Sequence, residues 1–482
     1  MRADPVDRES IANYWNDSKC REAEKRTYTL FWETANEILG CAPSYERPEP
    51  AFHAGIEVEC SLLTSEFEPA SESQRDSVIA KAHELYGGDE KLYDYELGAA
   101  QLEYRTPTPP PDLRAIGWEE YHSNLQKIED ALVSAASDKG LILLRCGANP
   151  FVDVDKIERT TTSKYVTVPN FHDRYKRFPL GSPDTKIGGS QLVDVKGADI
   201  IALTNAVQFI VDCKNFDDAI DKLNRALMIS PVLCSVCGNA RFLNGKDTEL
   251  SDLRMIAWEI SHDVRSPAEI LERSPQRVGM PDAYFVDLRD YFDRVSSYPF
   301  ILHPESAAAA FAVGLGIYWL DARIKFNSVA HRAVVEFRPL SVQPSLNEDI
   351  AAMAFYLGRL EWSQKSEERL LDLGLVRQNR YSAMRYGLDT ELWWMDQGQV
   401  KRDNARKVAQ KEFERAKIGL DSLSLWNEAS QNMLALLEAR LQEGNPSDKL
   451  ASSVNTYALQ GIPARSALKS AFADIGMTLP RE

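Results

Sequence analysis

Four short segments of the chain alternate polar and apolar residues, a pattern that predicts β-strands with two unlike faces. The segments are residues 55–59, 101–105, 207–212 and 334–338. Successive side chains of a strand point to opposite faces. We therefore expect one face of a sheet to bury Ile56, Val58, Leu102, Tyr104, Val335 and Phe337. The other face collects the polar residues Glu57, Glu59, Gln101, Glu103, Arg105, Gln208, Glu336 and Arg338.

The polar face has two interpretations. Ordinary half-exposed strands also place polar residues outward, and each segment taken alone fits that description. Four such segments together favour a functional face, because Glu is depleted in strands and like charges on one face repel unless a positive charge lies between them. Such a face suits hard cations and phosphates, so magnesium-dependent phosphoryl chemistry or acid–base catalysis by a carboxylate pair is the expected class of reaction.

Helical periodicity and linkers divide the rest of the chain. Apolar residues recur at helical spacing in 8–40, 113–138 and 216–229, and almost without interruption after residue 345. A polar, irregular stretch at 152–198 is typical of a substrate-facing loop. From these boundaries we expect three regions: an N-terminal helical segment at 1–45, a catalytic domain at 46–395 and a helical C-terminal extension at 396–482.

Composition excludes several classes of partner. The 482 residues include 72 acidic and 56 basic ones, and the net charge of −16 argues against general nucleic-acid binding or an anionic membrane surface. The longest apolar stretch, 307–320, is too short to cross a bilayer. The N-terminus lacks a secretory signal and the seven cysteines form no disulfide framework, so we expect a reduced, cytoplasmic protein. Cys234 and Cys237 form a lone pair that is expected to pack in the core.

The order of the motifs resembles that of the glutamate-cysteine ligases and their carboxylate-amine ligase relatives. Residues 55–59, Glu96 and 101–107 look like the opening of that family, and 207–212 is similar to its Val-Gln-Val-Asn-Leu-Asp strand. Later matches are Gly238, Asn239 and Phe242 with Arg254 and Trp258, then Glu336 to Arg338, then Asn379, Arg380, Ala383, Arg385, Gly387 and Leu388. The resemblance covers about residues 55 to 390.

This resemblance implies an α+β, glutamine-synthetase-like fold, in which an antiparallel sheet forms a funnel with helices outside. It also implies ATP and Mg²⁺ as cofactors, with small-molecule substrates. ATP would phosphorylate a carboxylate, such as that of an amino acid, and an amine would displace the phosphate to give an amide. By position, the resemblance implies that the metal ligands are Glu57, Glu59, Glu96, Glu103, Gln208 and Glu336. It implies that Arg254 and Arg338 are catalytic, and that Lys164, Arg380 and Arg385 bind the cofactor.

Two departures from the family pattern concern the substrates. Ile210 stands where the family strand has Asn, and Arg241 stands within the Asn-Ser-Pro-Phe segment. Because Ile210 removes a hydrogen-bonding group, we expect one substrate to be less polar or larger than those of glutathione synthesis. Two alternatives stay open: a phosphotransferase of the same fold, and a non-catalytic scaffold derived from a ligase. A homo-oligomer is compatible with each of these readings.

Overall fold

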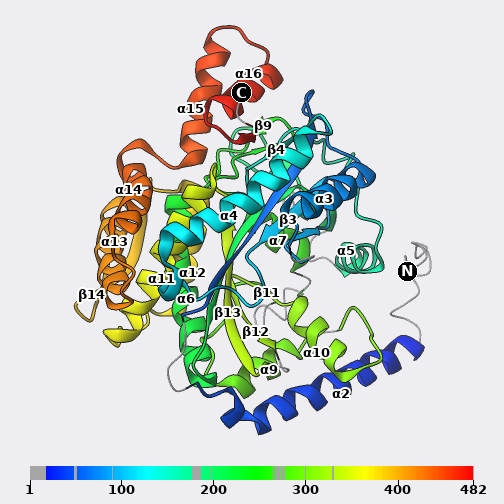
Figure 1. Cartoon of the computed structure of the whole chain (residues 1–482), viewed down its shortest axis with the longest axis vertical. Coiled ribbons are helices and arrows are strands. Elements are labelled where there is room, and N and C mark those ends of the chain that lie inside the picture. Colours follow the sequence, from blue (N-terminus) through cyan, green and yellow to red (C-terminus); the bar gives the residue numbers. More distant parts are fainter. Residues whose placement is uncertain are drawn as a thin grey trace.

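The centre of the molecule is an eight-stranded antiparallel sheet (Figure 1). Its strands run in the order β12-β13-β7-β1-β3-β2, while β4 pairs with β1 and β16 pairs with β4. The computed structural model describes residues 18–47, 52–88, 91–175, 186–195, 197–263, 265, 272, 277–298, 300–327 and 330–480. The strands are β1 (Ala54–Thr64), β2 (Tyr93–Tyr95), β3 (Gln101–Arg105), β4 (Leu141–Leu144), β7 (Ala206–Asp212), β12 (Ala322–Asn327), β13 (Arg332–Ser341) and β16 (Thr478–Leu479).

The four strands that alternation predicts are neighbours in this sheet, as β3, β1, β7 and β13. Their register places Glu57 opposite both Arg105 and Gln208, and Glu59 opposite Glu103. Ile210 lies opposite Glu336 in the β7 and β13 pair. Since paired residues of adjacent strands point to the same face, the predicted polar residues gather on one side of the sheet. The predicted polar face is thus formed.

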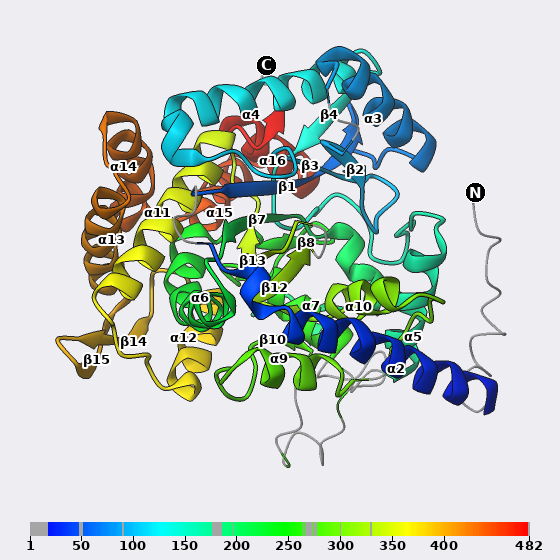
Figure 2. The same ribbon diagram turned by 60° about the horizontal axis from the view of Figure 1, so that its bottom comes forward.

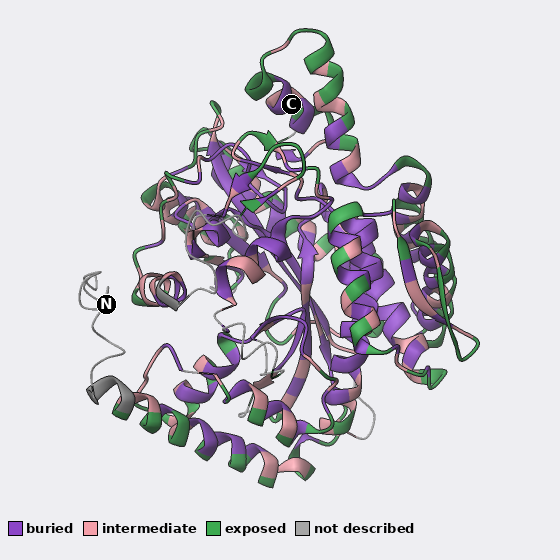
Figure 3. Cartoon of the chain, turned by 180° about the vertical axis from the view of Figure 1, so that it is seen from behind, coloured by how far each residue is buried: buried purple, intermediate pink, exposed green. Residues whose placement is uncertain are grey.

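Helices cover the apolar face of the sheet. The helices are α2 (Ser18–Gly40), α3 (Glu72–Tyr86), α4 (Leu113–Ser137), α5 (Ser163–Tyr175), α6 (Phe216–Cys237), α7 (Arg254–His262), α9 (Leu288–Val295), α10 (Ala307–Gly316), α11 (Leu346–Lys365), α12 (Leu373–Tyr386), α13 (Ala405–Ser422), α14 (Glu428–Glu443), α15 (Pro446–Leu459) and α16 (Ala464–Asp474). Helices α4, α6 and α11 pack on the apolar face, and α13 and α14 pack on α11 (Figure 2). Figure 3 shows the strands and inner helices buried and the outer helices exposed.

The apolar face is the main hydrophobic core. All six predicted core residues of the strands are at most 1% exposed, namely Ile56, Val58, Leu102, Tyr104, Val335 and Phe337. Phe337 stacks on Tyr356 of α11 with ring centroids 4.4 Å apart. Cys234 and Cys237 are buried in this core at the end of α6, as expected. Burial of these side chains holds the sheet in place, so the polar face is presented on a rigid support.

Shorter elements complete the fold. They are β5 (Lys186–Ile187), β6 (Val193–Asp194), β8 (Phe242–Leu243), β9 (Lys246–Asp247), β10 (Val278–Gly279), β11 (Trp319–Leu320), β14 (Glu391–Asp396), β15 (Gln399–Asn404), and the 3₁₀ helices η1 (Ala42–Tyr45) and η3 (Ala198–Leu203). None of the described helices is both long and apolar enough to cross a membrane.

Three expectations about the elements need correction or restriction. The prediction of nearly continuous helix after 345 was wrong, because β14 and β15 form a hairpin whose turn residues Gln397 and Gly398 have φ of 48° and 78°. Such left-handed turns match the twist of paired strands. The 152–198 stretch contains α5 and η3, so it is not irregular throughout. Residues 1–17, 176–185 and 196 lie outside the described residues. The three-domain division stays a prediction.

Candidate active site

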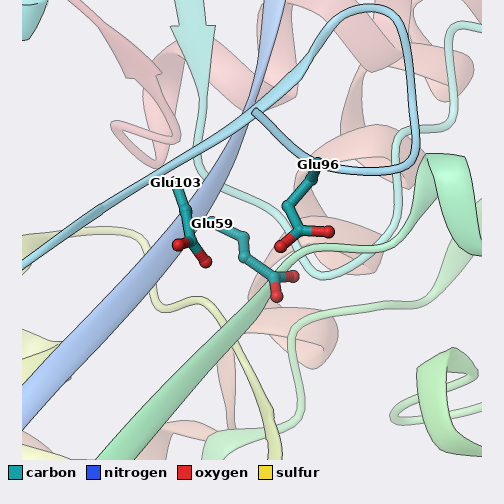
Figure 4. Close-up of side chains that lie close together, drawn as sticks. All are labelled: Glu59, Glu96 and Glu103. Carbon is teal, nitrogen blue, oxygen red and sulfur yellow. The ribbon is translucent and has the colours of Figure 1, made fainter. Parts of the chain in front are cut away.

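Three carboxylates meet on the polar face of the sheet. Glu59 of β1 and Glu103 of β3 are cross-strand partners, and the loop before β3 brings Glu96 to them (Figure 4). One oxygen from each carboxylate lies within 4.8 Å of the other two. Glu59 is 9% exposed and Glu103 is 6% exposed. We call these three residues the acidic cluster.

Burial and mutual repulsion raise the pKa values in the acidic cluster. Burial, and then the charge of Glu96, raises the pKa of Glu59 to about 7. Burial, and then the charges of Glu57 and Glu96, raises the pKa of Glu103 well above its usual value. Ionised carboxylates in this position are unfavourable unless a cation lies between them. The cluster is therefore suited to bind a divalent cation.

The donor set of the cluster fits Mg²⁺. Mg²⁺ prefers oxygen ligands, and carboxylates supply them here. Gln208 of β7 adds an amide whose Nε2 donates to Glu59 over 3.0 Å. The Oε1 atom of Gln208 is buried and has no hydrogen-bond partner among the described residues. An amide oxygen in that state is a further oxygen ligand beside the acidic cluster.

Magnesium binding is expected to release protons below pH 7. At pH 6 the Glu59 carboxyl, with its pKa of about 7, is mostly protonated, and a bound cation must displace that proton. Because the pKa of Glu103 is raised as well, the apparent Kd for Mg²⁺ is expected to rise by at least about tenfold for each pH unit below 7. Calorimetric titration at pH 6 in two buffers of different ionisation enthalpy measures the protons released. Binding heats that are equal in both buffers contradict this prediction.

A group of cations lies next to the acidic cluster on the same face. Arg323 and Lys325 of β12 and Arg338 of β13 all form ion pairs with Glu336. Burial alone would raise the pKa of Glu336, but these three cations hold it well below its usual value. Lys325 also lies 3.6 Å from Glu57. We call Arg323, Lys325 and Arg338 the cation group.

Two cavities that share lining residues open onto the polar face. A cavity of about 300 Å³, here called the acidic cavity, is lined by the acidic cluster, the cation group, Gln208 and Arg254. A cavity of about 660 Å³, here called the wide cavity, is lined mainly by apolar residues, including Pro107, Pro110, Phe311 and Phe326. Glu57, Arg105, Gly316, Arg323 and Lys325 line both. Within the cation group, Arg323 and Lys325 thus line both cavities, and Arg338 lines the acidic cavity.

The predicted catalytic arginines both line the acidic cavity. Arg254, at the start of α7, is 4% exposed, and its Nη1 donates to the carbonyl oxygen of Arg338 over 3.1 Å. Its Nε is buried and finds no acceptor among the described residues. Part of the guanidinium fork is thus available to an anionic ligand. Arg338 is held by Glu336.

The structure separates the three predicted cofactor-binding residues. Lys164 of α5 lines the acidic cavity, with its Nζ 4.8 Å from the ring centre of Tyr165. Arg380 is buried in α12, donates to Asp321 over 2.6 and 2.8 Å, and also pairs with Glu259. Arg385 is exposed on the same helix. Neither Arg380 nor Arg385 is among the residues that line the two cavities.

Arg380 is expected to stabilise the fold around the site. Its partners Asp321 and Glu259 lie just before β12 and in α7, the helix that carries Arg254. Replacing Arg380 with Ala leaves Asp321, which is 0% exposed, without its charge partner. A loss of about 3–5 kcal/mol in the free energy of unfolding is expected. Urea denaturation measures it, and exposed Arg385→Ala is the control, with a change within about 0.5 kcal/mol.

Two site residues were not found from the sequence although their signal was present. Arg323 and Lys325 alternate with Ala322, Ile324 and Phe326 in the same way as the four predicted strands do. Trp319 and His262, which also line the acidic cavity, carry no such pattern. They reach the cavity only through the packing of β11 and α7.

Ile210 and Arg241 lie away from the acidic cavity. Ile210 faces the wide cavity, opposite Glu336. Arg241 pairs with Asp247 over 2.8 Å and is not among the residues that line the two cavities. The two departures from the family pattern thus do not surround the acidic cluster.

Comparisons with known proteins agree with the fold. The family model described as glutamate-cysteine ligase family 2 matches residues 53–449. A putative glutamate-cysteine ligase 2 of Gloeobacter violaceus is 21% identical over 262 residues, which are 54% of this chain and 58% of that relative. The crystal structure of a glutamate-cysteine ligase from Francisella tularensis in complex with AMP superposes with a TM-score of 0.58 over 90% of each chain, at 12% identity. This likeness confirms the glutamine-synthetase-like α+β fold.

Proposed function

Because the chain belongs to glutamate-cysteine ligase family 2, we propose that it is an ATP- and Mg²⁺-dependent ligase that joins a carboxylate to an amine. The observation that carries this proposal is the acidic cluster beside the cation group, on one buried sheet face. A metal site next to a phosphate site is the arrangement that phosphoryl transfer to a carboxylate requires. The product of the complete reaction would be an amide.

In this proposal the acidic cluster and Gln208 hold the magnesium. Glu59, Glu96 and Glu103 supply carboxylate oxygens, and the unpartnered Oε1 of Gln208 supplies an amide oxygen. When bound there, Mg²⁺ would supply positive charge that offsets the negative charge of the phosphoryl group. Glu57 and Glu336, which the sequence also suggests as ligands, lie on the side of the cation group. Their role would be to position Arg323, Lys325 and Arg338.

The cation group and the wide cavity would bind the nucleotide. Arg323 and Lys325 line both cavities and Arg338 lines the acidic cavity, and their three positive charges suit the phosphates of ATP. The wide cavity offers apolar walls of a size suited to adenosine. In this arrangement Ile210 contacts the nucleotide, so the expectation of a less polar substrate has to rest on other residues.

Arg254 and Lys164 would hold the substrate carboxylate in the acidic cavity. The carboxylate oxygen attacks the γ-phosphorus of ATP and ADP leaves. The amine nitrogen then attacks the acyl carbon, loses a proton, and phosphate leaves. The buried guanidinium of Arg254 would orient the substrate carboxylate, because a planar guanidinium binds a carboxylate through two parallel hydrogen bonds.

Release of ADP and the identity of the products test the proposal. The full chain is mixed with ATP, Mg²⁺ and a panel of amino acids and amines, and each component is omitted in turn. We expect ADP release that requires a carboxylate and an amine together, and an amide product in the mass spectrum. ADP release with a phosphorylated product and no amide indicates the phosphotransferase instead. Absence of ADP release with every pair contradicts both enzymatic readings.

A further inference from the structure

Aromatic side chains form one wall of the acidic cavity. Trp258 and His262 of α7 and Trp319 of β11 all line this cavity. Their ring centres lie 4.8 Å apart for Trp258 and His262, 5.4 Å for Trp258 and Trp319, and 5.2 Å for His262 and Trp319. We call these three residues the aromatic wall. Its place is in the cavity that holds the acidic cluster and Arg254.

The aromatic wall is supported from behind. His172 of α5 is fully buried, and its ring lies 4.3 Å from His262 and 5.3 Å from Trp319. His262 is 2% exposed, whereas Trp258 and Trp319 are half-buried and line the cavity. Packed rings that keep part of their surface toward a cavity form a preorganised apolar platform.

The charge around the wall favours an uncharged ligand group. Burial, and then the charge of Arg277, lowers the pKa of His262 to about 3. Burial, His262 and Arg277 likewise lower the pKa of His172 well below its usual value. Both rings are therefore neutral at physiological pH. Aromatic faces attract cations in general, but Arg277 opposes a cationic group beside His262, and the carboxylates of the acidic cluster in the same cavity attract such a group more strongly than the rings do.

We propose that the aromatic wall binds a flat, uncharged aryl group on one of the two substrates of the ligase. This inference rests on the proposed function and specifies its substrate class. The small side chain of an amino acid such as cysteine leaves most of the cavity-facing surface of the two indoles without contact, whereas an aryl ring packs against it. Arg254 and Lys164 line the same cavity, so one molecule carrying a carboxylate and a ring reaches both an anion site and the wall.

Binding without turnover provides the first test. The full chain, with Mg²⁺ and a non-hydrolysable ATP analogue, is mixed with phenylalanine or with cyclohexylalanine, which has a puckered ring of similar size. Ligand-observed NMR is expected to show binding of phenylalanine about tenfold tighter than that of cyclohexylalanine, which is ~1.4 kcal/mol. Equal affinity for phenylalanine and cyclohexylalanine overturns the proposal. So does the absence of binding by all three aryl compounds, which are phenylalanine, 2-phenylethylamine and 3-phenylpropionate. The last two compounds distinguish an aryl amine from an aryl carboxylate as the natural source of the ring.

Variants of the wall provide the second test. Trp319→Leu is expected to lower kcat/KM for aryl substrates by about tenfold more than for aliphatic ones, while Trp319→Phe retains the preference. Trp393→Leu is the matched control, because Trp393 is half-buried in β14 and lines neither cavity. If the protein forms amides from aliphatic substrate pairs and Trp319→Leu keeps the wild-type ratio of kcat/KM between aryl and aliphatic substrates, the aromatic site is refuted. The proposed ligase activity is then still supported. Absence of ADP release with every pair refutes the ligase itself.

Discussion

Glu103→Gln is expected to lower the rate of amide formation by about a thousandfold. The side chain keeps its shape but loses the negative charge that draws a cation into the acidic cluster, where its carboxylate lies within 4.8 Å of those of Glu59 and Glu96. Binding of ATP in the presence of Mg²⁺ is expected to weaken in parallel. Steady-state kinetics and a magnesium titration of nucleotide binding measure the two effects.

Glu103→Gln is expected to fold normally. The pKa of Glu103 is raised well above its usual value by burial and by neighbouring carboxylates, so its ionised form is unfavourable in the folded protein without metal. An uncharged amide removes this penalty, and the unfolding temperature of the metal-free protein is expected not to fall. Exposed Glu391→Gln is the control for the change of side chain. Undiminished magnesium-dependent ATP binding in Glu103→Gln rules out the metal assignment.

Arg254→Lys is expected to lower kcat/KM by about a hundredfold. The guanidinium is 4% exposed, is held by the carbonyl oxygen of Arg338, and has a buried Nε without an acceptor among the described residues. A lysine offers one charge on a flexible stem, so the planar grip on a carboxylate or phosphate is lost although the charge is kept. Steady-state kinetics with the preferred substrate pair measure the effect.

A matched arginine separates the role of Arg254 from a general effect of the exchange. Arg289 of α9 has a 57% exposed side chain and pairs with Asp293 on the same helix. Arg289→Lys is expected to leave kcat/KM unchanged. If Arg254→Lys retains full activity while folding normally, Arg254 has no part in substrate binding. A loss of folding in Arg254→Lys, seen by circular dichroism, would show a structural role instead.

The four predicted strands show which structural features can be predicted from the sequence. A period of two specifies which residues of a strand share a face, and the burial of Ile56, Val58, Leu102 and Phe337 confirms that pattern. The polar side chains opposite them were therefore predictable as one set. The same rule, applied to residues 322–327, identifies Arg323 and Lys325 as well. The hairpin of β14 and β15 was missed because it lies between strongly helical segments and because β15 carries mainly polar, exposed residues.

The sequence did not predict which side chains from distant segments lie close together. Among the six suggested metal ligands, Glu59, Glu96 and Glu103 have oxygens within 4.8 Å of one another, whereas Glu336 is paired with cations, two of which come from β12. Arg380, suggested by motif order to bind the cofactor, lies in an ion-pair network with Asp321 and Glu259. Motif order locates a residue on the chain but does not state which partners surround its side chain.

The sequence by itself determined the strands, the polar face and the resemblance to the ligase family, because each depends on neighbouring residues or on their order along the chain. Only the tertiary structure decided which carboxylates meet, where the cations lie and which rings form the aromatic wall. Trp258, His262 and Trp319 come from two elements that are distant in sequence. Their approach depends on how α7 and β11 pack beside the curved sheet, and that packing is set by long-range burial rather than by any local pattern.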